Sequence, residues 1–232
     1  MAEENGKNGD PIIKLEGVGK SFTRGKERLD VLKDLDLTVP TGSFEALMGP
    51  SGSGKSTLLN LIAGLDEPTA GTLTVAGANL GNMSEGQRAA WRAQNIGFVF
   101  QTYNLMPVLT AIENVELPLL LAKLPAAERR KRAEIALRVV GLEDRAGHLP
   151  RQLSGGQEQR VTIARAIVAD PKIIVADEPT GDLDRQSAND ILNLLDKLNK
   201  EFNKTIVMVT HDAAAAERAQ IVRRLDKGAL VS

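Results

Sequence analysis

The chain has 232 residues, of which 42% are hydrophobic and 25% are charged, and its formal net charge is −1. This length and composition fit a folded α/β unit with a substantial buried core. The nearly neutral charge gives no electrostatic reason to expect a nucleic-acid partner. The sequence contains no cysteine, which excludes disulfides and thiolate chemistry.

Targeting and membrane-spanning segments are not evident. The first ten residues are polar and acidic, without the apolar core of a secretory signal, and they predict a flexible tail. No segment approaches the ~20 apolar residues that cross a bilayer. The longest candidate, Leu117 to Leu124, contains Pro118 and Lys123. If the protein serves a membrane, another chain supplies the span.

The N-terminal part predicts a small antiparallel sheet. Apolar and polar residues alternate over Ile12 to Val18 and over Leu35 to Val39, with a turn-rich stretch at about 23–28 between them. Phe44 to Met48 predicts a compact strand. Four further elements are expected before residue 101: a helix at Thr57–Ala63, a strand at Thr72–Val75, a helix at Ser84–Gln94 and a strand at Ile96–Phe100.

The chain then becomes helical, from about residue 102 to residue 160, with Gly141 as a stop signal. The C-terminal third alternates strand, helix and strand, which predicts βαβ units and a parallel sheet. We therefore expect residues 11–232 to form one nucleotide-binding domain with a helical insertion. The elements expected after residue 101 are helices at Ala111–Leu121, Ala126–Val140, Ile163–Val168 and Gln186–Asn199, and strands at Ile173–Ala176 and Thr205–Thr210.

A phosphate-binding loop follows the Phe44–Met48 strand. The segment Gly49-Pro50-Ser51-Gly52-Ser53-Gly54-Lys55-Ser56-Thr57 fits G-x-x-x-x-G-K-[ST], whose backbone N–H groups wrap a nucleotide's phosphates. Lys55 is expected to meet the β- and γ-phosphates, and Ser56 to offer its hydroxyl to Mg²⁺. The helix that follows directs its positive end at the anion. The segment predicts binding of a nucleoside triphosphate.

Polar side chains close three of the expected core strands. Asp177 ends an apolar strand, where a carboxylate can hold Mg²⁺ beside the phosphate loop. Glu178 follows it, and a second carboxylate off the metal suits the activation of an attacking water. Gln101 and His211 close neighbouring strands, at the ligand-facing edge of a parallel sheet. Gln101 is expected to bond the water and Mg²⁺, and His211 to bond the γ-phosphate, although His211 alone also fits an ordinary strand-end histidine.

A second glycine motif, Leu153-Ser154-Gly155-Gly156-Gln157, opens a helix. Ser154 is well placed as an N-cap, and an exposed helix N-terminus with flanking glycines is also an anion site. Because the Lys55 loop already serves the chain's own nucleotide, the natural ligand of this motif is a nucleotide held by a second copy of the domain.

Together, in this order, these motifs resemble the ATP-binding subunit of ATP-binding cassette (ABC) transporters over nearly the whole chain. The resemblance implies a P-loop NTPase core with a mainly parallel sheet, an N-terminal antiparallel β subdomain and a helical insertion. It also implies a head-to-tail homodimer with two ATP molecules, each between the Lys55 loop of one copy and the Ser154–Gln157 motif of the other. The family pattern further places Asp184 in contact across that interface and Phe22 in a stack on adenine.

Two longer runs are similar to the macrolide-export, lipoprotein-release and cell-division group of that family, the MacB, LolD and FtsE types. They are Gln101-Thr102-Tyr103-Asn104-Leu105-Met106-Pro107 with Thr110–Val115, and Ala176–Asp184. This resemblance implies a separate ATPase subunit at the cytoplasmic face of the inner cell membrane, although the ATPase part of a truncated fusion protein would have the same sequence. The ATPase subunit would drive integral membrane permease subunits that move or extract substrate at the outer side.

Two alternatives remain open at this point. ATP turnover could control an extracytoplasmic enzyme in a signalling complex, with nothing transported. A soluble ABC ATPase acting on DNA or ribosomes is disfavoured, because such proteins usually carry a long coiled coil or two cassettes and this chain has neither.

Two positions depart from the usual pattern of the family. Glu158 directly follows the second motif, and Glu45 stands in a normally apolar strand, where it would need a partner if buried.

Overall fold

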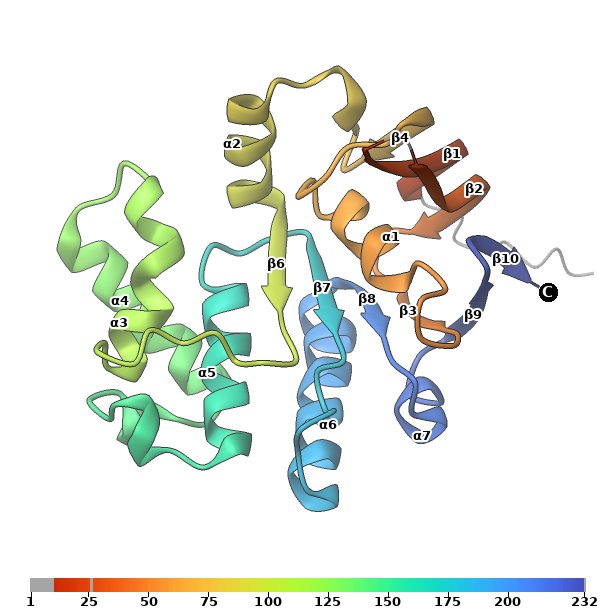
Figure 1. Ribbon diagram of the computed structural model, residues 1–232. Helices are drawn as coiled ribbons and strands as arrows, with labels where there is room; N and C mark the ends of the chain where they lie inside the picture. Colours follow the sequence, from red (N-terminus) through yellow and green to blue (C-terminus); the bar gives the residue numbers. More distant parts are fainter. Residues whose placement is uncertain (1–10, 26, 232) are drawn as a thin grey trace, which may run out of the picture.

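The computed structural model describes residues 11–25 and 27–231, so the tail predicted at residues 1–10 lies outside the described residues. Figure 1 shows two sheets on one side of the molecule and a group of helices on the other. One sheet is antiparallel and the other is mainly parallel. This arrangement confirms the predicted P-loop NTPase fold class.

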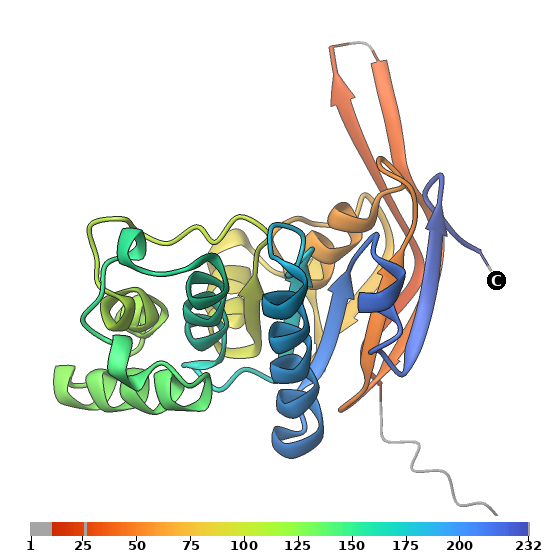
Figure 2. The same cartoon turned by 90° about the horizontal axis from the view of Figure 1, so that it is seen from below.

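The antiparallel sheet has the strand order β2-β1-β4-β5. The predicted strands are confirmed but are longer than expected, because β1 (Pro11–Arg24) and β2 (Glu27–Pro40) stay paired as far as Arg24 and Glu27. Figure 2 shows this hairpin projecting beyond the body of the molecule. Its outer part is exposed and therefore lacks the alternation that marks a half-buried strand. The other two strands are β4 (Ala70–Val75) and β5 (Ala78–Asn79).

The second sheet has the strand order β10-β9-β3-β8-β7-β6. Strands β3, β6, β7, β8 and β9 run parallel, and β10 pairs antiparallel with β9. Strands β9 and β10 were not predicted, because charged residues interrupt any apolar pattern in β9. The strands are β3 (Phe44–Met48), β6 (Ile96–Val99), β7 (Ile173–Asp177), β8 (Thr205–Val209), β9 (Ile221–Asp226) and β10 (Ala229–Val231).

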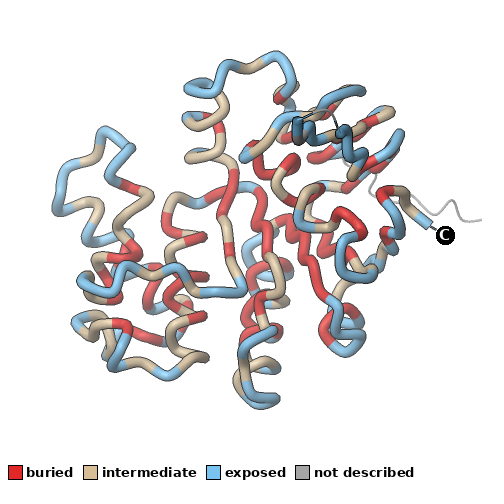
Figure 3. The backbone as a smooth tube through the Cα atoms, in the orientation of Figure 1, coloured by how far each residue is buried: buried red, intermediate tan, exposed pale blue. Residues whose placement is uncertain are grey.

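The parallel sheet lies between two hydrophobic cores, which explains its continuous apolar strands. Ile173 and Val175 of β7 face the core shared with α1 (Lys55–Ile62) and the antiparallel sheet. Ile174 and Ala176 face the other core, which is shared with the helices. Successive strand residues alternate sides, so each face receives every second residue. Figure 3 shows the buried residues following these strands through the centre.

Each predicted helix has a counterpart in the structure, with one break. The predicted helix at Ala111–Leu121 is an α-helix, α3 (Ala111–Glu116), followed by a 3₁₀ helix, η2 (Leu117–Leu121). Pro118 lacks the N–H that would continue the α-helical bonding. The other predicted helices are α2 (Glu85–Asn95), α4 (Ala126–Val139), α5 (Gly155–Ile167) and α6 (Arg185–Phe202). Four short helices were not predicted: η1 (Leu80–Asn82), η3 (Glu143–Arg145), η4 (Pro150–Gln152) and α7 (Ala213–Ala216). Within the described ranges, none of the helices has the length and apolar character needed to cross a bilayer.

Glu45 is buried, with 1% of its side chain exposed, and it has the partner that burial requires. Arg223 of β9 bonds both carboxylate oxygens, with Nε at 2.6 Å from Oε2 and Nη2 at 3.3 Å from Oε1. The same Nη2 donates to the carbonyl oxygen of Thr38 at 2.9 Å. The charged residue in β3 therefore joins β9 to the centre of the parallel sheet and to the end of β2.

Candidate functional site

The carboxyl ends of the parallel strands meet at one edge of the sheet, and the sequence-predicted residues gather there around a cavity of about 550 Å³. The phosphate loop follows β3, Gln101 lies two residues beyond β6, Asp177 and Glu178 lie at the end of β7, and His211 follows β8. The residues that line the cavity are Leu29, Val31, Gly49, Ser51, Gly52, Gly54, Lys55, Ser56, Thr57, Gln101, Asp177, Glu178, Val209 and His211.

The loop at Gly49–Gly54 needs glycine for steric reasons. A Cβ on Gly49 would lie 2.1 Å from the carbonyl oxygen of Leu225, and one on Gly54 would lie 2.7 Å from Leu32 Cδ2. Gly54 also has a φ of 102°, in the region that favours glycine. It begins α1 without a side-chain cap, so the first N–H groups of the helix are free to meet an anion.

Two polar groups of the loop point to a phosphate ligand. The Oγ atom of Ser53 is buried and has no hydrogen-bond partner among the described residues, a situation that usually has a specific cause such as a missing ligand. The Lys55 ammonium donates to the carbonyl oxygens of Gly49 at 2.8 Å and Pro50 at 2.9 Å. The Lys55 ammonium therefore lies over the phosphate loop, where it can exchange its bonds to these carbonyls for bonds to phosphate oxygens.

Ser56 and Asp177 bring two oxygen donors together beside the loop. The Ser56 hydroxyl donates to Asp177 Oδ1 at 3.4 Å, a long and weak hydrogen bond. Burial raises the pKa of Asp177, and the neighbouring Glu178 charge adds to that effect, while the Ser56 bond and Lys55 oppose it. Mg²⁺ prefers one or two carboxylates with phosphate and water oxygens. This pair fits such a shared site, since a cation would relieve the cost of burying the carboxylate charge.

Glu178 and His211 form a close pair at the next two strand ends. Glu178 Oε1 lies 2.9 Å from His211 Nδ1, and the backbone nitrogen of His211 donates to Glu178 Oε2 at 3.4 Å. Glu178 has a positive φ of 49°, and its own N–H donates to Val209. This left-handed turn directs the carboxylate toward β8, away from Asp177. The hydrogen bond to Glu178 and the charge of Glu178 raise the pKa of His211.

Gln101 also lines the Lys55 cavity. Its Nε2 donates to Asp182 Oδ1 at 3.2 Å, in the loop after Glu178. A Cβ on Gly181 would lie 3.0 Å from that Nε2, so this loop and the Gln101 side chain are closely packed. The amide is thus placed between the phosphate loop and the loop that carries the acidic dipeptide.

The second glycine motif forms a separate and smaller cavity of about 260 Å³. Ser154 caps α5 by accepting the N–H of Gln157 at 3.3 Å, and Gln157 Oε1 accepts the Ser154 N–H at 2.9 Å. The predicted N-cap is therefore confirmed. Partial burial raises the pKa of Glu158 in the first turn. The residues around this cavity are Gly141, Leu142, Ser154, Gly156, Gln157, Arg160, Ser187 and Asp190, and none of them lines the Lys55 cavity.

Four predicted site residues lie outside these cavity linings: Ser53 and Gly155, which belong to the two glycine motifs, and Asp184 and Phe22, which lie elsewhere. Asp184 is the N-cap of α6, and its pKa is lowered by the hydrogen bond from the Ser187 hydroxyl and, beyond that, by the backbone N–H groups of Ser187 and Gln186. Phe22 is exposed on β1, with the Lys20 ammonium 4.9 Å from its ring centroid. The apolar wall of the Lys55 cavity comes instead from Leu29 and Val31 of β2, which we did not single out from the sequence.

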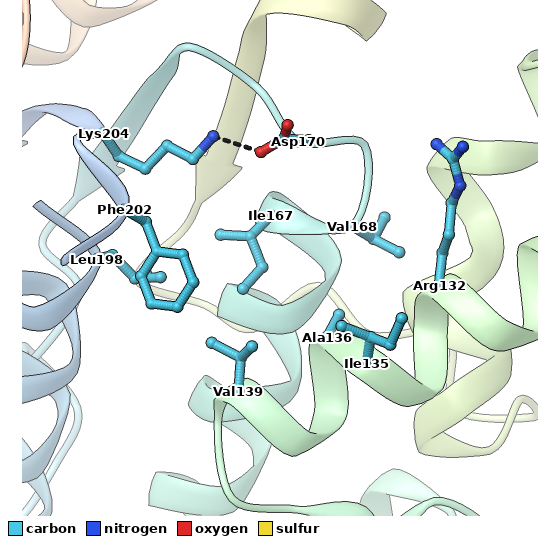
Figure 4. A pocket seen from close by; sticks show the side chains of 10 residues that line it. All are labelled: Arg132, Ile135, Ala136, Val139, Ile167, Val168, Asp170, Leu198, Phe202 and Lys204. Atoms are coloured by element: carbon cyan, nitrogen blue, oxygen red, sulfur yellow. Dashed lines mark hydrogen bonds and ion pairs between the residues drawn. The ribbon is translucent and has the colours of Figure 1, made fainter.

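A mainly apolar groove away from these motifs lies between α4 and the ends of α5 and α6 (Figure 4). Ile135, Ile167 and Phe202 line this groove of about 390 Å³, and Lys204 pairs with Asp170 at its rim at 2.5 Å. None of the sequence-predicted site residues lines it. The chemistry therefore belongs to the two glycine-motif cavities.

A phosphate loop between a parallel strand and a helix, with an acidic dipeptide at the end of another strand of the same sheet, defines a P-loop nucleotide-binding protein. The family profile described as ABC transporter matches residues 32–181. The chain belongs to this family, and it is an ATPase that binds ATP.

Individual relatives support the same assignment. The chain is 47% identical over 224 residues to a macrolide export ATP-binding/permease protein MacB 1/2 of Paracoccus denitrificans, covering 97% of this chain and 33% of the relative. It is 46% identical over 221 residues to the lipoprotein-releasing system ATP-binding protein LolD of Legionella pneumophila, covering 95% and 97%. The chain spans about a third of the length of the MacB relatives that it matches.

A solved structure of similar size shows the same fold. The dimeric ATP-binding cassette MJ0796, a protein of Methanocaldococcus jannaschii, bound to ADP and Pi in a post-hydrolysis state, superposes with a TM-score of 0.87 at 45% identity. The alignment covers 95% of this chain and 97% of that one. The predicted family and activity are confirmed by these comparisons.

Proposed function

We propose that this chain is the ATPase subunit of a membrane transporter and that two copies close head to tail around two ATP molecules. The observation that carries this proposal is the separation of the two phosphate-binding surfaces. The Lys55 cavity and the Ser154 cavity share no lining residue, and each is open at the surface. A nucleotide held by Lys55 can meet a Ser154–Gln157 motif when a second copy supplies it. The dimeric state of the similar cassette MJ0796 supports this arrangement.

Within such a closed site, we propose that Glu178 accepts the proton of the water that attacks the γ-phosphate. His211 would hold the carboxylate in place through its 2.9 Å contact and bond the γ-phosphate. Gln101 would orient the water and contact the metal. Mg²⁺, held by Ser56, Asp177 and the phosphates, would neutralise the charge that develops during transfer. The terminal phosphate would be held by Lys55 of one copy and by Ser154 and Gly156 of the other.

We further propose that residues 11–232 form one domain, that residues 102–160 are its helical subdomain, and that the domain binds an integral membrane permease at the cytoplasmic face of the membrane. A second apolar groove supports a permease as the partner, because residues of β6, the strand that leads to Gln101, line this groove. Phe98 and Phe100 stack at its wall with ring centroids 4.1 Å apart, and Leu121 lines it with 81% of its side chain exposed. A permease helix seated there would sense movements of the Gln101 loop.

The relatives support one type of permease. The names of the MacB and LolD relatives describe macrolide export and lipoprotein release, and this chain covers about a third of the first and nearly all of the second. We therefore propose a permease of this type, which moves or extracts its substrate at the outer side of the membrane.

The test is affinity purification of tagged Glu178→Gln protein with ATP from detergent-solubilised membranes of the source cell. We expect an integral membrane protein with a large extracytoplasmic domain to accompany it. Leu121→Asp should lose that protein, whereas Ile135→Asp, an exposed residue of the groove in Figure 4, should retain it. ATP binding by each variant serves as the folding control. Recovery of soluble DNA- or ribosome-associated proteins alone would contradict the proposal.

A further inference from the structure

Gln159 lies in the middle of α5, completely buried, and it bonds two loops of the proposed catalytic site. Its Nε2 donates to the carbonyl oxygen of Phe100 at 3.2 Å and to that of Pro179 at 2.7 Å. Phe100 directly precedes Gln101, and Pro179 directly follows Glu178. One side-chain amide therefore joins the main chain next to the two residues that would handle the attacking water.

The two main-chain carbonyls fix the orientation of this amide, and a second side chain supports it. The Thr162 hydroxyl, also fully buried, donates to Gln159 Oε1 at 2.9 Å and to the Gln159 carbonyl oxygen at 2.8 Å. The carbonyl oxygens of Phe100 and Pro179 can only accept hydrogen bonds, so they require the rotamer whose NH₂ group faces the two loops, and the Thr162 hydroxyl then donates to the remaining amide oxygen. Both hydrogens of that NH₂ group have an acceptor, and the buried group is fully satisfied.

The helix that carries Gln159 also carries the second glycine motif at its first turn. Arg165, two turns further along α5, donates to the carbonyl oxygens of Tyr103 at 2.9 Å and Asn104 at 2.7 Å. The Gln101 loop is thus attached to α5 both before Gln101, at Phe100, and after it, at Tyr103 and Asn104. A displacement of α5, such as closure on a partner's nucleotide, would be transmitted to Gln101 and Glu178 through these bonds.

We propose that Gln159 is a positioning residue for ATP hydrolysis: its amide holds the Gln101 and Glu178 loops in register with each other and with α5. The proposal rests on the catalytic roles given above to Glu178 and Gln101. It assigns Gln159 no contact with ATP. Its consequence is that hydrolysis in one site depends on the placement of the helix that contacts the nucleotide in the other.

The variant Gln159→Met keeps the length and volume of the side chain and removes the amide. Because small misplacements of catalytic groups have large kinetic effects, we expect kcat to fall by at least about tenfold and the KM for ATP to change by less than about threefold. The chain offers a matched control in Asn199, 4% exposed, whose Nδ2 donates to the carbonyl oxygens of Gly42 and Lys204 at 2.8 Å each. That amide lies away from the lining of the Lys55 cavity.

The Asn199→Leu control should lower the thermal midpoint Tm as Gln159→Met does, because each change leaves two main-chain carbonyls without a donor. Its kcat, measured well below both midpoints, should stay within about twofold of wild type, since no catalytic loop is released. Equal losses of kcat in the two variants, or a Gln159→Met enzyme with normal kcat, would overturn the proposal.

A milder pair of variants decides the matter if Gln159→Met does not fold. Thr162→Val removes the hydroxyl that donates to the amide oxygen and should lower kcat by several-fold, while Thr162→Ser retains the hydroxyl and should restore it. Equal kcat in these two variants would overturn the proposal. The Glu178→Gln protein is measured alongside, because near-normal turnover there would overturn the catalytic assignment itself, and the role of Gln159 with it.

Discussion

The ion pair between Glu45 and Arg223 predicts an unequal response to the loss of either partner. Arg223→Leu leaves a carboxylate that is 1% exposed without its bidentate donor. Breaking a buried pair from one side typically costs about 3–5 kcal/mol. Because 28% of the Arg223 side chain is exposed and water can enter at that edge, we expect the lower end, about 3 kcal/mol of unfolding free energy.

The reverse substitution should cost less. Glu45→Leu leaves the Arg223 guanidinium with its bond to the Thr38 carbonyl and with access to solvent. We expect a loss of about 1 kcal/mol, typical of one hydrogen bond to a partly exposed group. The double variant Glu45→Leu/Arg223→Leu restores the apolar character usual for β3 and should be more stable than Arg223→Leu alone.

Urea unfolding measures these differences, with the emission of Trp91, the single tryptophan of the chain, as the signal. Trp91 packs in the core beneath the antiparallel sheet. With an m-value of about 3 kcal/mol/M, the Arg223→Leu midpoint should fall by about 1 M. Equal midpoints for the two single variants, or a double variant less stable than Arg223→Leu, would refute the account of a buried carboxylate that depends on its partner.

Three further predictions concern the nucleotide site. Lys55→Ala should weaken ATP binding by at least about tenfold, because it removes a charged donor to phosphate; calorimetric titration measures the Kd, and unchanged affinity would contradict the phosphate-loop assignment. Gly54→Ala should also weaken binding, because its Cβ would collide with Leu32 at a positive φ; normal binding would show that the loop can rearrange. The His211 pKa, followed by NMR titration, should lie above its ordinary value in wild type and fall in Glu178→Gln. Since that pKa is raised in the folded state, the ion pair is complete below the ordinary histidine value and is lost as pH rises through the folded-state value; identical titrations in the two proteins would contradict the contact.

Much of the site was predictable because it depends on strand order and local motif. Once Phe44–Met48, Ile173–Ala176 and Thr205–Thr210 were recognised as parallel strands, their ends had to meet at one edge. Gln101 and His211 follow from that rule, and the structure brings both to the Lys55 cavity. Their catalytic roles remain predictions.

The parts that were not predicted depend on contacts between distant segments. Gln159 bonds main-chain carbonyls, which have no signature in the sequence, across 59 and 20 positions. Leu29 and Val31 reach the cavity because the hairpin strands extend further than their polarity suggests. Arg223 belongs to a strand without an apolar pattern. Its positive charge is explained by the buried Glu45 with which it pairs, a contact between distant segments that the sequence does not reveal.

The central claim is that a complete ATP site needs two copies of the chain, and the most direct test is the mass of the Glu178→Gln protein by light scattering. The chain mass is 24.9 kDa. We expect that mass without nucleotide and about twice that mass with saturating ATP, because bound ATP then persists between the copies. Adding Ser154→Arg should keep the single-chain mass while ATP still binds. A single-chain mass of Glu178→Gln with ATP bound, or an equal dimer with Arg in place of Ser154, would contradict the shared site.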